Sequence, residues 1–192
     1  SSNSVTSGSG RDSVSVTGQM YASGGGKNTI DTGLNEPGKG FDAVNVKYGT
    51  VASGNGSQNH ITSDVVRVTN LNGTAVYTSA DQGSSAETHI TARQNLLIDG
   101  SNANGSAYGV FSQGDSSTRN VIKAGTGIEI NAATSGSGDA LGVYANWSST
   151  AQIETAQGDI AITADSAQGQ AWGVNGNNNV SLKATGQGGK IT

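Results

Sequence analysis

The sequence predicts an all-β fold, a single-stranded parallel β-helix (β-solenoid), from three observations. One pattern is repeated three times between residues 95 and 187, and its apolar anchors Leu96, Ile128 and Ile160 are spaced 32 residues apart. Only 34 of the 192 residues are Val, Ile, Leu or Phe, which is enough for the narrow core of a solenoid. Thirty glycines and a single proline suit tight turns between short strands. We therefore expect coils of about 31 residues with three short strands each.

The first half of the chain shows the same alternation of apolar and polar residues. Residues 13–17 read Ser-Val-Ser-Val-Thr, which places Val14 and Val16 on one face of a strand. The next two coils begin with equivalent pairs, Val44 and Val46 and then Val66 and Val68. The spacing from Val44 to Val66 is only 22 residues. Residues 13–192 are thus predicted to form the solenoid array, and residues 1–12 a linker or a frayed first coil.

Two further features concern the limits of this array. Residues 33–40 hold Pro37 and three glycines, so we expect a loop insertion there, and such loops in solenoids can carry function. Near the other end, Ile191 begins another layer just before the last residue. An uncapped final coil would expose its core and an open strand edge. We therefore expect the chain to be a truncated piece of a longer protein.

Each repeat contains three strand-like segments. The first resembles Ile128-Glu-Ile, the second is centred on a glycine, and the third carries one apolar anchor per coil: Ile90, Ile122, Ile153 and Leu182. Strict alternation in the second segment predicts that the valine after the glycine and the residue before it point inward. The predicted inward residues are Val110, Val143 and Val174, with Tyr108, Leu141 and Trp172. The glycine and the residue two positions after it should point outward.

The predicted outward positions of this second strand contain the candidate functional site. They carry Phe111, Tyr144 and Asn175, and alignment of the preceding coil adds Tyr77. Tyr77, Phe111 and Tyr144 would form an exposed row with one aromatic ring per coil. Such a row suits sugar rings or the apolar patch of a partner. Alternatively, it is a cross-strand ladder that only stabilises the sheet or is covered by a loop.

The residues that follow the apolar anchors of the third segment predict a row of charges. This row gives independent support for the predicted register between coils. After each apolar anchor the outward residues are Thr91, Lys123, Glu154 and Lys183. The last three alternate in sign, so stacked neighbours would attract one another. Exposed pairs of this kind contribute at most about 1 kcal/mol each.

Catalytic, metal and cofactor sites are not predicted. The aspartates do not recur at one repeat position, so no groove of converging carboxylates is expected. His60 and His89 have no serine, cysteine or second histidine at ligand spacing, which favours a surface or turn role, and cysteine is absent. A net charge of −4 with scattered Lys and Arg argues against nucleic-acid binding, and no apolar stretch is long enough for a membrane span.

The run Gly127-Ile-Glu-Ile-Asn-Ala, followed by small polar turns and Gly142-Val-Tyr, resembles the repeats of large bacterial exoproteins of the filamentous haemagglutinin and autotransporter type. The resemblance covers nearly the whole chain from Ser13. It implies a right-handed parallel β-helix exported across an outer membrane and anchored at the bacterial cell surface through another part of the protein. Adhesion, self-association or biofilm formation would be its role.

Two classes of non-enzymatic function follow from these expectations. In the first, the segment is an adhesin that attaches to host glycans or surface proteins, or to identical chains. In the second, it is a purely structural stalk or a subunit of a surface filament or layer. A carbohydrate-active β-helix enzyme is less favoured, because the spacing of the carboxylates provides no acidic groove.

Overall fold

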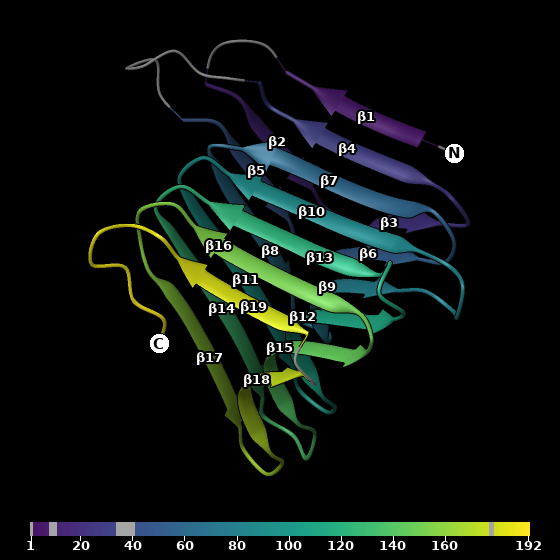
Figure 1. Ribbon diagram of the computed structural model, residues 1–192, viewed down its shortest axis with the longest axis vertical. Helices are drawn as coiled ribbons and strands as arrows, with labels where there is room; N and C mark the ends of the chain where they lie inside the picture. Colours follow the sequence, from purple (N-terminus) through teal and green to yellow (C-terminus); the bar gives the residue numbers. More distant parts are fainter. Residues whose placement is uncertain (1, 8–10, 34–40, 177–178) are drawn as a thin grey trace.

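The computed structural model describes residues 2–7, 11–33, 41–176 and 179–192, and within these residues it is a β-solenoid without helices (Figure 1). Parallel strands lie in three sheets that wrap around one core, and the chain visits each sheet once per coil. The predicted fold class is confirmed. The described residues contain no helix long and apolar enough to cross a membrane.

The three sheets are named A, B and C. Sheet A contains β1 (Ser2–Thr6), β4 (Lys27–Asp31), β7 (Ser57–Ser63), β10 (Ala86–Ala92), β13 (Arg119–Ala124), β16 (Thr150–Thr155) and β19 (Val180–Ala184). Sheet B contains β2 (Ser13–Val16), β5 (Ala43–Val46), β8 (Val65–Asn70), β11 (Asn95–Asn102), β14 (Gly127–Thr134) and β17 (Ile160–Ser166). Sheet C contains β3 (Met20–Ser23), β6 (Thr50–Ser53), β9 (Thr74–Ser79), β12 (Ala107–Gly114), β15 (Ala140–Trp147) and β18 (Ala171–Gly176).

The register between coils agrees with the apolar anchors. In sheet B, one continuous row runs through Val14, Val44, Val66, Leu96, Ile128 and Ile160. This row includes the short 22-residue step between Val44 and Val66, and an isolated parallel bridge joins Ile160 to Ile191. In sheet A the predicted anchors also pair from coil to coil, from Ile90 to Leu182. Stacked strands therefore place like residues above one another.

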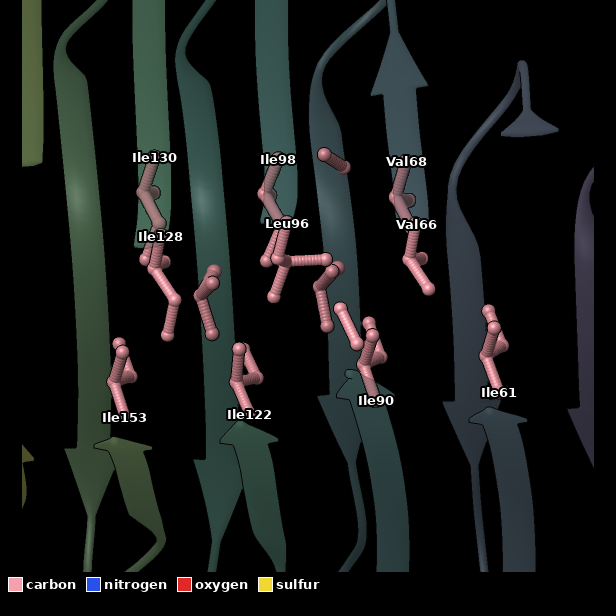
Figure 2. Close-up of a cluster of buried hydrophobic side chains, with 14 of the residues drawn as sticks. Ile61, Val66, Val68, Ile90, Leu96, Ile98, Ile122, Ile128, Ile130 and Ile153 are labelled. Carbon is pink, nitrogen blue, oxygen red and sulfur yellow. The ribbon is translucent and has the colours of Figure 1, made fainter. Parts of the chain in front are cut away.

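The core is a column of aliphatic side chains between the sheets. Figure 2 shows two facing rows, one from sheet A and one from sheet B. The first row holds Ile61, Ile90, Ile122 and Ile153, and the second holds Val66, Val68, Leu96, Ile98, Ile128 and Ile130. All of these side chains are buried. Because every coil contributes only a few of them, a chain with few apolar residues can still close a continuous core.

Polar side chains fill the corner of the interior where sheets A and C meet. The Nδ2 group of Asn28 donates to Oδ1 of Asn59 at 3.0 Å, and Asn59 donates in turn to the carbonyl oxygens of Met20 and Val51. Two coils further on, Asn120 donates to the carbonyl oxygen of Phe111. These bonds satisfy buried groups that would otherwise destabilise the fold. They also tie sheet A to the backbone of sheet C.

The charge row on sheet A has the predicted order. Lys123 pairs in register with Glu154, and Glu154 with Lys183. The Lys123 and Lys183 ammonium groups lie 3.9 and 3.2 Å from carboxylate oxygens of Glu154. The alternation of sign therefore reports the register correctly.

The alternation predicted for sheet C is wrong at the central glycine. A Cβ atom on Gly109 would lie 2.5 Å from Cγ2 of Ile130, so this glycine faces the interior and not the solvent. Val110 is also fully buried, and it pairs in register with Val143 as expected. Two consecutive residues therefore face inward, and the glycine and the residues before it face the sides opposite to those predicted.

Two predictions for the N-terminal part of the chain, a linker before the array and a loop at residues 33–40, have different outcomes. Ser2–Thr6, within the range for which a linker or a frayed coil was expected, forms β1 and pairs in parallel with β4. The expected loop at residues 33–40 lies outside the described residues apart from Gly33, which has a positive φ of 77°.

Candidate functional site

The register of sheet C brings Tyr77, Phe111 and Tyr144 together in one row. Tyr77 pairs with Phe111, and Phe111 with Tyr144. The rings of Tyr77 and Phe111 are stacked, with centroids 5.1 Å apart and planes tilted by only 5°. The ring of Tyr144 lies 5.3 Å from that of Phe111 on the other side. The geometry of the predicted row is therefore present.

Tyr108 joins this row, although alternation placed it in the interior. Its ring makes an edge-to-face contact with Phe111 at 5.1 Å and lies 6.2 Å from Tyr144. Both contacts are possible because Gly109 and Val110 both face inward, so Tyr108 and Phe111 lie on the same outer face of β12. Leu141 and Trp172 follow Tyr108 in register on this face. We refer to Tyr77, Tyr108, Phe111 and Tyr144 as the aromatic surface.

The rings of the aromatic surface are not equally accessible. Phe111 is only 9% exposed, because aromatic rings contact it on both sides, whereas the three tyrosines are half-buried. A partner would therefore meet the tyrosines and not Phe111. The same outward row continues toward the N-terminus through Val51 to Tyr21, which is 54% exposed. The sequence alignment of coils stopped at Tyr77 and missed this extension.

Trp147 stands at the end of β15, beside the aromatic surface, and has an unusual backbone. Its φ of 59° makes it the one residue other than glycine with positive φ in the described part of the chain. Its register partner one coil earlier is Gly114, which also has a positive φ. The backbone N–H of Trp147 donates to Oδ1 of Asn146 at 2.9 Å, and its carbonyl oxygen accepts from Nδ2 of Asn179 at 2.9 Å. These bonds hold a conformation that bulky residues rarely adopt.

The side chain of Trp147 is 59% exposed and borders two hollows. One, of about 430 Å³, is lined by Asp81, Gln82, Gly114, Asp115 and Ser148 together with Trp147. The other, of about 170 Å³, is lined by Ser79, Gln113, Asp81 and Trp147, and also by Tyr77. Tyr77 and Trp147 thus connect the aromatic surface to a polar depression at the corner between sheets C and A.

The carboxylate of Asp115 accepts three hydrogen bonds at this corner. Hydrogen bonds from the hydroxyl and the backbone N–H of Ser117, and from the backbone N–H of Gly83, lower the pKa of Asp115. Its carboxylate is therefore a hydrogen-bond acceptor at neutral pH. The hollow combines an apolar ring face with carboxylate and amide groups, which is the composition of a site for a polyhydroxylated ligand.

A larger hollow of about 830 Å³ lies over sheet B but offers less defined chemistry. Its ionisable lining residues are Arg67, Glu129 and Asp159. The Oε1 atom of Glu129 accepts from Asn131, and the Oδ1 atom of Asp159 accepts the backbone N–H of Lys190. These carboxylates serve local hydrogen bonds of the fold, as Asp115 does, but no aromatic ring of the described residues lines this hollow. The corner at Trp147 is the stronger candidate because it adds an exposed ring to its polar groups.

His60 and His89 lie on the outer face of sheet A, and the fold makes them neighbours although they have no ligand spacing along the sequence. They pair in register on sheet A, and their ring centroids are 4.8 Å apart. The side chain of Glu87 lies next to them, with Oε2 at 3.4 Å from Nε2 of His89. A search for ligand spacing along the sequence missed this group because the histidines are one coil apart. Each precedes an apolar anchor, Ile61 or Ile90, and this shared position is the signal that could have revealed them.

No family model, curated protein or solved structure matches the chain. The assignment of a function therefore depends on the residues themselves.

Proposed function

We propose that this chain is a non-enzymatic, carbohydrate-binding segment of an adhesin at the bacterial cell surface. The observation that carries the proposal is the exposed ring of Trp147 beside a polar hollow and next to the aromatic surface. A pyranose ring presents C–H groups on its faces and hydroxyl groups around its rim. The indole face of Trp147 suits the C–H groups, and the polar side chains of Asp81, Gln113 and Asp115 suit the hydroxyl groups.

The backbone of Trp147 supports a role beyond packing. A non-glycine residue with positive φ costs on the order of 1–3 kcal/mol and persists only where the surroundings hold it. Trp147 is mostly exposed, so its side chain recovers little of this cost by burial. Such strain is concentrated at ligand-binding and catalytic sites. The preceding coil has Gly114 at this position. We therefore attribute the tryptophan to contact between its ring and a bound ligand.

The variant Trp147→Gly tests this proposal. Glycine adopts positive φ freely, so the relief of strain offsets the 0.5–1 kcal/mol that glycine typically costs in backbone entropy. The variant should melt at the same temperature as the wild type or higher. Binding to the glycans that the wild type recognises on an array should fall at least tenfold.

The matched control is Tyr48→Ala, which removes another exposed aromatic ring, at a position that lines neither hollow. Its glycan binding should equal that of the wild type. If Trp147→Gly and Tyr48→Ala bind alike, the site is not at Trp147. If the wild type binds no glycan, the proposal is wrong and the structural-stalk alternative is favoured.

A further inference from the structure

Three side chains with metal-binding groups meet on the outer face of sheet A. Glu87 and His89 are two residues apart on β10, so alternation places both on the same face. His60 lies on the neighbouring strand β7, directly opposite His89. The alternate residues of both strands are buried in the core, including Ile61 and Ile90. The two strands therefore fix the positions from which the three side chains project.

The ligand atoms of this group are close together. One ligand atom from each of His60, Glu87 and His89 can be chosen so that all three lie within 4.8 Å of one another. The two imidazole rings are tilted by 39°, so their edges converge to one side instead of stacking flat. A tetrahedral ion needs nitrogen and oxygen ligands about 2.0–2.2 Å from its centre. In a tetrahedral site, ligand atoms at that distance from the ion lie about 3.3–3.6 Å from one another. The three side chains would therefore have to move slightly closer together when an ion binds.

The two histidines carry buried nitrogen atoms that lack hydrogen bonds. Within the described residues, neither Nε2 of His60 nor Nε2 of His89 has a hydrogen-bond partner, although both atoms are buried. The Oε2 atom of Glu87 lies 3.4 Å from Nε2 of His89, which is longer than a typical hydrogen bond. A buried polar atom without a partner destabilises the fold. Here two such atoms belong to neighbouring side chains and lie beside the same carboxylate.

Burial favours the neutral form of both imidazoles, which is the form that binds metal ions. Burial lowers the pKa of His60, and the nearby His89 lowers it further. Burial also lowers the pKa of His89, although the carboxylate of Glu87 partly opposes this effect. Neutral imidazole has a free lone pair on one nitrogen and can bind a metal without first losing a proton.

Glu87 is oriented by a second residue. The Nε atom of Arg119, its register neighbour on β13, lies 2.6 Å from Oε1 of Glu87. Oε2 lies on the side of the histidines, where it also accepts a hydrogen bond from Nε2 of Gln58 at 3.5 Å. Outer partners of this kind commonly fix the ligands of metal sites. The positive charges of Arg119, Lys27 and Lys123 around the site reduce the affinity for any cation, so we expect binding of moderate strength.

We propose that His60, Glu87 and His89 bind one Zn²⁺ ion across two successive coils. Two imidazoles and one carboxylate form a ligand set that zinc uses with a further position left for water. Calcium and magnesium prefer sites made entirely of oxygen atoms. The ion would connect β7 to β10 through side chains, in addition to the backbone ladder. It would therefore stabilise the solenoid against separation of these coils.

The test is a titration of the metal-free chain with Zn²⁺ by calorimetry, together with thermal melting at several Zn²⁺ concentrations. We expect one ion per chain and a melting temperature that rises with the logarithm of Zn²⁺ concentration, while Ca²⁺ produces no rise. His60→Gln and His89→Gln should each weaken binding by at least tenfold. The control Thr62→Ala changes the next outward residue on β7 and should bind like the wild type.

Two further measurements separate this site from adventitious binding and from unfolding. Circular dichroism should show that the histidine variants keep the strand content of the wild type, and Glu87→Gln gives a third variant if either does not. Co²⁺ in place of Zn²⁺ should give the visible absorption of tetrahedral coordination, which the histidine variants should lose. Absence of Zn²⁺ binding in the wild type, or unchanged affinity in folded histidine variants, would overturn the proposal.

Discussion

Truncation of Ile130 to alanine tests how the core column is held together. Ile130 is fully buried in the middle of sheet B, between Ile98 and Ile162 in the adjacent coils. Replacing a buried isoleucine by alanine costs about 2–5 kcal/mol, depending on how far the surroundings collapse into the cavity. Backbone hydrogen bonds hold neighbouring coils at about 4.8 Å, so little collapse is possible. We therefore expect a loss of about 4 kcal/mol for Ile130→Ala.

The assay is chemical denaturation followed by circular dichroism, with thermal melting beside it. A loss of this size lowers Tm by roughly 8–16 °C in a chain of this length, at about 2–4 °C per kcal/mol. The matched control is Ile162→Ala, the same change one coil further on, where the side chain is only partly buried. It should cost about half as much. Equal losses for the two variants, or a loss below about 1 kcal/mol for Ile130→Ala, would refute the description of the core.

Three other predictions concern Gly109 in β12, His60 in β7 and Glu154 in the charge row. Gly109→Ala should destabilise the fold by more than about 2 kcal/mol, because the new methyl group would lie 2.5 Å from a side chain and 2.6 Å from the carbonyl oxygen of Gly142. In the presence of a chelator, the wild type should lose stability as the pH falls below about 6.5, since unfolding relieves the burial that lowers the pKa of His60. His60→Gln should lose less over the same range. Glu154→Gln should change stability by less than about 1 kcal/mol, because its ion pairs are exposed.

Each of these predictions has a control or a contrary result. Gly18→Ala should be nearly neutral, since a Cβ atom there meets nothing within 4 Å, and a similar loss at both glycines would contradict the inward assignment of Gly109. The pH effect follows from the sign of the shift: the unfolded chain takes up the proton first, so stability is lost toward acid. Identical pH profiles for the wild type and His60→Gln would contradict it. A loss of stability well above about 1 kcal/mol in Glu154→Gln would contradict the prediction that these exposed ion pairs contribute little.

The sequence predicted the stacking of coils well because one physical rule governs it. Valine and isoleucine recur at alternate positions and at nearly constant spacing, so the row from Val14 to Ile160 could be assigned without a structure. The register of Lys123 and Glu154 followed from the same anchors. Even the short step to Val66 was recognised, because both valines of the pair are present in each coil.

The faces of sheet C could not be predicted by alternation alone. Gly109 and Val110 both face inward, and this single departure places Tyr108 beside Phe111 on the outside. A glycine inside a strand is a known sign of a bulge or of close packing, and it was present in the sequence. The rule of strict alternation ignores this sign. It therefore predicted the wrong face for Gly109 and for the residues before it in β12.

The two candidate sites depend on neighbours that lie one coil apart. His60 and His89 become neighbours only through the register of β7 and β10, and a search along the sequence for ligand spacing cannot find them. The importance of Trp147 comes from its positive φ and from the hollows beside it. Those properties arise from the turn that follows β15, and no periodic pattern in the sequence reports them.

The most direct test of the proposed function is glycan binding by the wild type and Trp147→Gly, measured side by side on one array and confirmed by titration. Our account predicts that the wild type binds a defined set of glycans, and that the variant loses this binding by at least tenfold while melting no lower. Equal binding by both proteins, or no binding by the wild type, would contradict the account.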